Sequence, residues 1–168
     1  MPSKPIFSLC LIVSLVLLAG CGQKMPDGMP KLYHVTIIVT QENKPLADAL
    51  VSLRSVDTAA TGTWTIGGRT DTNGSVELFT EGFRGAPLGK FKVVLIKQVT
   101  EGMEALETAL NSRGDVAAAQ KGVKIWSMVK EEYNNQSQTP LEVEITAGAK
   151  TLELDAGHAV KIEVPFVP

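Results

Sequence analysis

Hydrophobic and polar residues alternate along much of the chain, with the period of two that is typical of β-strands with one buried face. Residues 33–40 show this pattern first, because Val35, Ile37 and Val39 fall on one face and mostly polar residues on the other. Residues 91–96 become apolar on both faces, which favours a central strand. Further strands are predicted at residues 49–54, 75–79, 141–145, 152–154 and 160–164.

Turn residues separate these predicted strands. Asn43-Lys44-Pro45 follows the first strand and is typical of a turn. Asp71-Thr72-Asn73-Gly74 predicts a tight hairpin between residues 69–70 and 75–79, because Asn-Gly supplies the positive φ angles that such a turn needs. Residues 57–68 are rich in Thr, Ala and Gly, and we expect a loop there with a short strand at its end.

The hydrophobic period changes near residue 99. Met103, Leu106 and Leu110 recur at helical spacing, with Thr100 as a candidate N-cap, and they predict a helix at residues 101–111. Residues 115–130 predict a second helix or an irregular excursion. Together these segments form a helical insertion at residues 99–131.

The whole pattern predicts an all-β fold. Seven or eight short strands joined by turns imply a β-sandwich over residues 32–168, with one helical insertion around residues 100–130. A chain of this size buries about 68–70% of its unfolded surface, which is enough for a hydrophobic core. The two cysteines, Cys10 and Cys21, both precede this domain, so no disulfide or cysteine-built metal site is expected within it.

The N-terminal segment has the features of a secretory signal peptide. Lys4 precedes an apolar run at residues 6–20, and we assign residues 1–20 to the signal. The alternative is a membrane-spanning helix, but a run of about fifteen residues covers roughly 22 Å of a hydrocarbon core of about 30 Å.

The apolar run ends in Leu18-Ala19-Gly20-Cys21, which resembles the lipobox of bacterial lipoproteins. The resemblance implies that Cys21 is acylated and becomes the first residue, and the alternative is a chance cysteine after a signal peptide. Acyl chains would hold the protein on a membrane without crossing it. Residues 21–31 then comprise the lipidated cysteine and a tether, whose Gly and Pro residues predict flexibility.

The balance of charged side chains limits the classes of partner that we expect. The chain has 16 basic and 18 acidic side chains, a near balance that argues against nucleic-acid binding. The expected partners are membrane lipid through Cys21 and, in the envelope, other proteins or cell-wall glycans.

Three motifs resemble the carboxypeptidase regulatory-like domain. They are residues 39–53, which include Lys44-Pro45-Leu46, then Thr70-Asp71-Thr72-Asn73-Gly74, and then Gly89-Lys90-Phe91-Lys92-Val93. The resemblance covers residues 33–156 and implies a seven- to eight-stranded, transthyretin-like (Ig-like) β-sandwich. These motifs specify turns, so they indicate architecture and not chemistry.

A version of this family in small bacterial lipoproteins ends much like residues 132–145 here. The chain also departs from the family pattern. Asp48 stands where glycine is usual, Asn43 stands where a small or glycine turn residue is common, and residues 99–131 are longer than usual.

No catalytic or metal-binding motif stands out. His34 and His158 are the two histidines, and they lie near opposite ends of the predicted domain, so we interpret both as edge or surface residues. Asp71-Thr72-Asn73-Gly74 resembles the start of a calcium loop, but Gly82 stands where the loop needs a glutamate. A transthyretin-like hydrolase is a further alternative, but the chain lacks the Tyr-Arg-Gly-Ser-type terminus of that class. We therefore expect no enzyme activity and no cofactor.

Trp64 and Trp126 are the candidate ligand contacts, because both fall in predicted excursions where aromatic rings can stack on sugars or anchor proteins. The alternative is that each tryptophan covers the core beneath its loop. The predicted helix at 101–111 likewise either docks a partner or covers one end of the sandwich.

These observations predict a non-catalytic lipoprotein of the bacterial cell envelope, held to the membrane by Cys21 on the periplasmic or cell-surface side. Its sandwich would serve as a structural or protein-interaction module. The alternatives are a carbohydrate or cell-wall binding module that uses loop aromatics and, less in keeping with the residues, a hydrolase.

Overall fold

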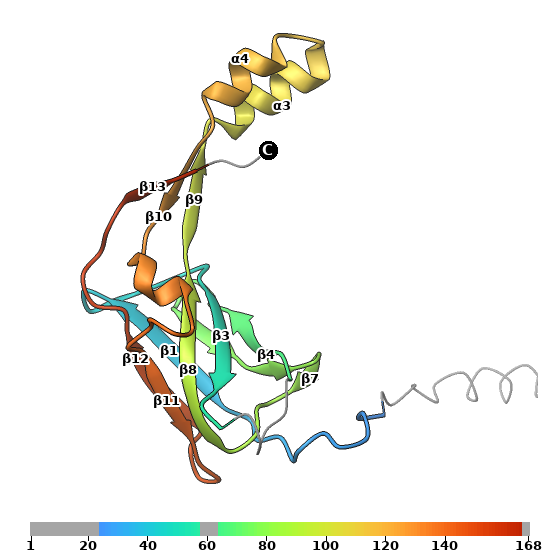
Figure 1. The fold of residues 1–168 in the computed structure, drawn as a ribbon, viewed down its shortest axis with the longest axis vertical. Coiled ribbons are helices and arrows are strands. Elements are labelled where there is room, and N and C mark those ends of the chain that lie inside the picture. The colour runs from blue at the N-terminus through green and yellow to red at the C-terminus, as the bar shows by residue number, and fades with distance from the viewer. Residues whose placement is uncertain (1–23, 58–63, 166–168) are drawn as a thin grey trace, which may run out of the picture.

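The computed structural model describes residues 24–57 and 64–165, and Cys21 with the predicted signal peptide lies outside them. Two β-sheets pack face to face, and a third, smaller sheet stands out from this sandwich (Figure 1). Strands hold 40% of the residues and helices 15%, which confirms the predicted all-β sandwich with a helical insertion.

One sheet of the sandwich has four strands. β1 pairs in parallel with β12 and antiparallel with both β2 and β5. The bounds are β1 Thr36–Gln41, β2 Lys44–Pro45, β5 Ser75–Glu77 and β12 Thr151–Asp155.

The other sheet has six strands, in the order β11-β8-β3-β4-β6-β7. The predicted central strand is confirmed, because β8 lies between β11 and β3. Seven of the ten sandwich strands have three residues or more. The bounds are β3 Leu50–Ser55, β4 Ile66–Arg69, β6 Phe79–Thr80, β7 Phe83–Arg84, β8 Gly89–Ile96 and β11 Glu142–Ile145.

The core lies between the two sheets and follows the predicted alternation. β1 places Ile37 and Val39 inward, and β8 places Phe91, Val93 and Leu95 inward, all fully buried. Burying side chains of this size stabilises the fold by about 1.5–3 kcal/mol each. Other buried members are Val35, Val51, Leu53, Ile66, Val76, Leu78, Val143, Ile145 and Leu154.

Two turns need the left-handed backbone conformation. Glu42 and Asn43 have φ of 52° and 60°, so the β1–β2 connection is a two-residue hairpin turn with both central φ angles positive. Asp48 has φ of 54°, which is the conformation that glycine adopts most readily.

The turn predicted at Asp71-Thr72-Asn73-Gly74 is present, but the simple hairpin is wrong. Only Gly74 takes a positive φ, of 72°, and the Asp71 carboxylate accepts hydrogen bonds from the backbone N–H groups of Asn73 and Ser75. The flanking strands then pair in different sheets, β4 with β3 and β6, and β5 with β1. The turn is therefore a corner at which the chain crosses between the two layers.

The helical insertion also differs from the prediction. Thr100 does not cap a helix, because it belongs to a strand, and Gly102 precedes the first helical residue. The second predicted helix is a short helix followed by a strand that contains Trp126. The bounds are β9 Gln98–Glu101, α3 Met103–Ser112, α4 Val116–Lys121 and β10 Lys124–Ser127.

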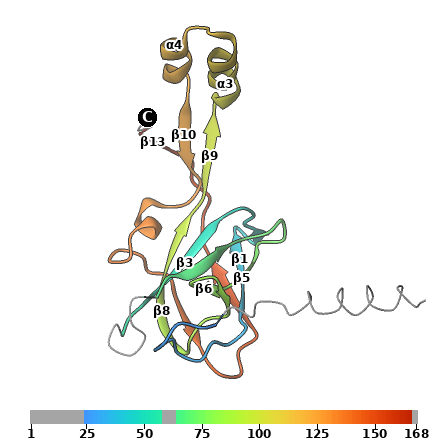
Figure 2. The ribbon, with the colours of Figure 1, turned by 90° about the vertical axis from the view of Figure 1, so that its right-hand side faces the viewer.

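The last strand leaves the sandwich. β13 (Ile162–Val164) pairs with β10, and β10 pairs with β9, which makes the third sheet. We call β9, α3, α4, β10 and β13 the arm. Figure 2 shows it as an extended ribbon with the two helices at its tip.

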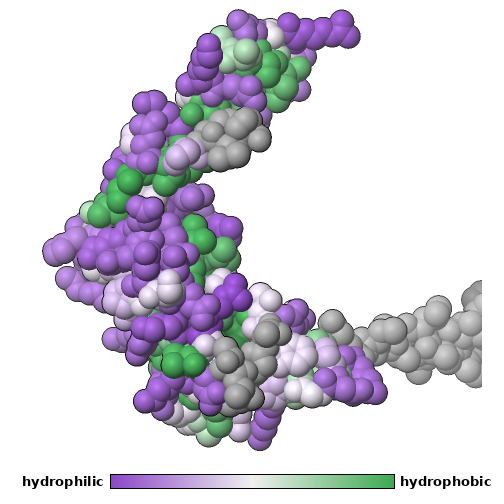
Figure 3. Space-filling view, viewed as in Figure 1, coloured by the Kyte–Doolittle hydropathy of each residue, from purple (hydrophilic) through white to green (hydrophobic). Residues whose placement is uncertain are grey.

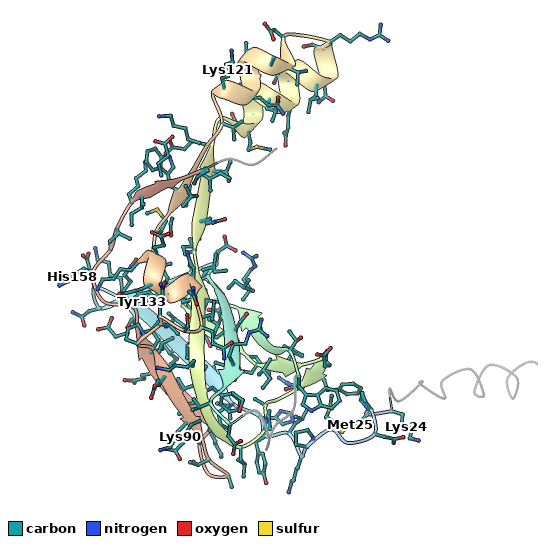
Figure 4. The ribbon with its side chains drawn as sticks, viewed as in Figure 1. Lys24, Met25, Lys90, Lys121, Tyr133 and His158 are labelled. Carbon is teal, nitrogen blue, oxygen red and sulfur yellow. The ribbon has the colours of Figure 1, made fainter. Side chains whose placement is uncertain are left out.

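The arm and the N-terminal tether lie at opposite ends of the molecule. The 3-10 helix η2 (Glu131–Asn134) connects the arm to the sandwich and buries Tyr133 in the core. Figure 4 shows Lys121 at the tip of the arm, Tyr133 near its base, and Lys24 and Met25 beside the far end of the sandwich.

Candidate functional site: the projecting arm

A close approach of two glycines joins the helices to the strands of the arm. Gly102 has φ of 83°, and a Cβ atom at this position would lie 2.4 Å from the carbonyl oxygen of Gly122. A side chain here would therefore be strained and would push the two chains apart. Because Gly102 has no side chain, β9 can lead directly into α3 beside Gly122, where the chain passes from α4 to β10.

The helical tip has a small core of its own. Leu106 on α3 and Val123 after α4 are its buried apolar residues. The Asp115 side chain accepts a hydrogen bond from the Ala118 N–H at 2.9 Å and so caps α4. With little apolar surface buried, the tip depends on the ribbon beneath it for support.

One face of the arm sheet carries Trp126 under charged side chains. The register places Trp126 between Val99 of β9 and Glu163 of β13. Lys161 Nζ lies 4.4 Å from the centre of the Trp126 ring and Lys124 Nζ lies 5.7 Å from it. These cation–π contacts occupy the ring and hold the C-terminal strand against the arm.

The same face contains an ion pair that fixes its charge. Lys161 Nζ donates a hydrogen bond to Glu101 Oε1 at 3.0 Å. This contact lowers the pKa of the Glu101 carboxyl, with a smaller effect from the Trp126 indole N–H nearby, which lies outside hydrogen-bond geometry. Glu101 is therefore ionised at neutral pH, and the group is suited to holding strands together and not to proton transfer.

The opposite face of the arm sheet is apolar at β13 and part of β10, and polar at Gln98 and Thr100 of β9. Ile125 and Val164 are register partners and half-buried, and Ile162 next to them is exposed. Ser127 on the same face is buried, so the exposed apolar part of this face is at Ile162.

Large hydrophobic side chains are exposed along the arm. Leu110 on α3 is 59% exposed, and Val99, Met103 and Ile162 are each about 40% exposed. Figure 3 shows hydrophobic residues at the tip and along the arm between hydrophilic ones. Apolar groups presented in this way on a projecting element are typical of protein contact surfaces.

A hollow on the sandwich is one of several concave features outside the arm. It has a volume of about 400 Å³ and lies on the outer face of the six-stranded sheet, between Leu50 and Phe79. Its floor is open because Gly67 has no side chain, and a Cβ there would lie 2.4 Å from the Val51 carbonyl oxygen. The hollow carries one acidic side chain, Glu81, and no cluster of reactive groups.

The two candidate tryptophans do not form one site. Trp64 is partly buried and packs against the sandwich core, as the structural alternative predicted. Trp126 lies on the arm in β10, so its placement in a loop was wrong. Neither ring offers the open face that sugar stacking needs, because one packs on the core and the other meets two lysines.

The histidines do not converge. His34 precedes β1, and His158 lies 3.8 Å from Glu42, which follows β1, so roughly 20 Å of strand separates them. Both are exposed (Figure 4 labels His158). Among residues 24–57 and 64–165, no three His, Cys, Asp or Glu side chains gather closely enough to hold a metal ion.

The sequence interpretation missed Val99 and Ile162 as exposed contact residues. The available signal was weak, because Val99 keeps the parity of Phe91, Val93 and Leu95 but lies between the charged Lys97 and Glu101. The sequence around Ile162 does not indicate that its strand pairs with β10 and not with a strand of the sandwich.

Comparison with protein-family models, curated proteins and solved structures finds no match for the chain. None of the helices in the described ranges has the length and apolar character required to traverse a bilayer.

Proposed function

We propose that the protein is a lipid-anchored envelope protein whose arm contacts other proteins, with the sandwich as a rigid support. The observation that carries this proposal is the arm itself: a three-stranded ribbon and two helices that leave the sandwich and expose Val99, Met103 and Leu110. An element with so small a core of its own is more simply explained by a contact surface than by a stabilising role.

The anchor is the second part of the proposal. Leu18-Ala19-Gly20-Cys21 supports acylation of Cys21, and residues 22–31 give the anchor a short tether. The described chain begins at the end of the sandwich farthest from the helices (Figure 1), so the tether leaves the arm unobstructed.

A non-catalytic role agrees with the arrangement of charged groups. Most carboxyl groups with a lowered pKa face Arg or Lys partners in exposed ion pairs, as Glu77 does with Arg84 and Glu142 with Lys92, and Glu81 instead accepts a hydrogen bond from the Thr65 N–H. The turn motifs support kinship with the carboxypeptidase regulatory-like domain, which we retain as part of the proposal.

Photocrosslinking at two matched positions tests the arm. Leu110 and Val56 are both apolar and both 59% exposed, but Leu110 lies on the arm and Val56 on the sandwich. With a photoreactive amino acid at each position in the full chain, in cells, we expect discrete crosslinked proteins from Leu110 and few from Val56. Equal crosslinking at both positions would show that the arm has no special role.

A separate experiment tests the anchor. A Cys21→Ser chain should lose the acyl mass on mass spectrometry of the membrane fraction and should move to the soluble fraction. Membrane retention of this variant without acylation would contradict the proposed anchor. That result concerns the anchor alone, and the crosslinking experiment at Leu110 tests the arm.

A further inference from the structure

Three stretches of chain connect the arm to the sandwich. Lys97 lies between β8 and β9, Met128 follows β10, and residues 156–161 lie between β12 and β13. The first two are joined directly, because the Met128 N–H donates a hydrogen bond to the Lys97 carbonyl oxygen at 2.8 Å. A change in the direction of the arm would have to bend the chain at all three connections (Figure 2).

Two turns of the sandwich lie at these connections. Glu42 and Asn43 form the turn between β1 and β2, and Asp48 lies in the turn between β2 and β3. The three residues have positive φ angles of 52°, 60° and 54°, a conformation that glycine adopts most readily. Residues with side chains that are kept in this conformation are concentrated at functional sites. The side chains at these positions are therefore candidates for a role beyond the turn itself.

Asp48 holds the connection between β8 and β9. Lys97 Nζ lies 3.2 Å from Asp48 Oδ2 and 3.4 Å from the Asp48 carbonyl oxygen, and the Lys97 side chain is only 16% exposed. An ammonium group with so little contact with water depends on such partners. Arg69 Nη1 on β4 lies 2.8 Å from Oδ1 of the same carboxylate, so the sandwich fixes the point to which Lys97 is attached.

Gln41 holds the other two connections together. Its side-chain amide donates a hydrogen bond to the Met128 carbonyl oxygen at 3.0 Å and lies 3.5 Å from the His158 carbonyl oxygen. Met128 follows β10, and His158 lies on the approach to β13. One amide at the end of β1 thus bridges both stretches.

Glu42 holds the approach to β13 at two further points. Its backbone N–H donates a hydrogen bond to the Gly157 carbonyl oxygen at 3.0 Å, and its carboxylate accepts one from the Ala159 N–H at 3.1 Å. Hydrogen bonds to a charged group are stronger than those between neutral groups. Glu42 is therefore a firm attachment for this stretch, in which Figure 4 labels His158.

We propose that Gln41, Glu42 and Asp48 form a clamp that fixes the direction of the arm. When the clamp opens, the arm swings about its three connections. Among the residues that the structure describes, no hydrogen bond or ion pair joins β9, β13 or the two helices to a strand of the sandwich. The clamp is therefore the part of the sandwich that sets where the arm points.

The position of the clamp magnifies its effect. β9 and α3 follow each other along the arm and together extend for about 28 Å. A small rotation at the base therefore displaces the helices at the tip by a larger distance than it moves the connections. This inference concerns how the arm is held, and it does not depend on what the arm binds.

Fluorescence energy transfer between the two ends of the molecule tests the clamp. Figure 4 shows Lys90 and Lys121 at opposite ends. In the full chain with Cys10→Ser and Cys21→Ser, the substitutions Lys90→Cys and Lys121→Cys provide the only thiols for the two dyes. We expect a narrow distribution of distances in this chain, measured on single molecules in detergent.

Glycine substitutions separate the side chains of the clamp from the turns that carry them. Glu42→Gly and Asp48→Gly remove the carboxylates and leave a residue that suits the positive φ. Combined with Gln41→Ala, they should broaden the distance distribution and make hydrogen exchange of the Ala159 N–H about tenfold faster. Asn43→Gly is the matched control, because it makes the same backbone change in the same turn, and its side chain forms no hydrogen bond within the described ranges.

A conservative variant and a single variant complete the test. Glu42→Gln alone should keep the narrow distribution, because its amide oxygen can still accept the Ala159 N–H. Gln41→Ala alone should broaden the distribution by less than the triple variant, and it leaves the backbone of the turn unchanged. Thermal unfolding of each variant shows whether the sandwich itself is still folded, and the single variant serves for the comparison if the triple variant is not.

Two results would overturn the clamp. One is a distance distribution that stays as narrow in the triple and single variants as in the unchanged chain. The other is equal broadening in the Asn43→Gly control, because glycine in the turn and not the loss of the clamp side chains would then be the cause. Crosslinking of other proteins at Leu110 is a separate result, and neither outcome here decides it.

Discussion

Asp48 shows how one residue satisfies two demands. Its φ of 54° is the conformation that favours glycine, but its carboxylate bonds Arg69 at 2.8 Å and Lys97 at 3.2 Å. A glycine would fit the turn and lose both ion pairs. The residue thus links the β2–β3 turn to β4 and to the base of the arm.

The pH dependence of stability should report this contact. Hydrogen bonds from Arg69, and then Lys97, hold the pKa of the Asp48 carboxyl below its usual value. A carboxyl whose folded pKa is lowered stabilises the protein above its unfolded pKa, about 3.9, and this effect is lost as the pH falls through the folded pKa.

We therefore expect Asp48→Asn, which tolerates the same φ, to lower Tm modestly at pH 7 and by progressively less as the pH falls below about 3.9. Thermal unfolding followed by circular dichroism from pH 3 to 7 measures the difference. An equal difference in Tm between the two proteins at both ends of the pH range would mean that the charge of Asp48 does not contribute to stability.

At the scale of elements, the strand pattern of the sequence was a good guide to the sandwich. β1, β3, β8 and β11 all lie where alternation predicts them, because each has one face in the core. The corner at Asp71–Gly74 was misjudged since turn residues specify a bend but not which sheet receives the next strand.

The arm was harder to predict for a related reason. The stripe of Met103, Leu106 and Leu110 indicates a helix that needs a cover, but not that the helix lies away from the sandwich, where only Leu106 is buried. The strand around Trp126 has four residues, too few for a clear period, and the partner of β13 is set by contacts distant in sequence.

The attachment of β13 to the arm depends on Lys161. Its cation–π contact with Trp126 and its ion pair with Glu101 hold the start of β13 against the arm, so we expect Lys161→Ala to speed hydrogen exchange in β13 about fivefold. Exchange in β8 should not change. Lys150→Ala, which removes an exposed lysine away from the arm, is the control, and a similar effect in both variants would contradict this role.

At the scale of the whole molecule, the sandwich and the arm have different roles. The sandwich holds the buried core, and the arm carries four of the nine large exposed hydrophobic side chains of the described residues on a narrow support. Because few of the core residues lie in the arm, we expect the sandwich to fold without the helical tip.

Removal of the helical tip is the most direct test of whether the sandwich folds independently of the arm's helices. Glu101 and Lys124 are register partners, so an Asn-Gly turn between them can replace residues 102–123 and close a hairpin. The shortened chain should keep the thermal unfolding transition of the sandwich.

The decisive measurement is the set of proteins crosslinked to the full and the shortened chains in cells, by a reagent that reacts with surface lysines. The account predicts that the shortened chain stays in the membrane fraction, folded, and loses most of the crosslinked proteins. If it keeps the same proteins in the same amounts, the tip of the arm is not the surface through which this protein meets its partners.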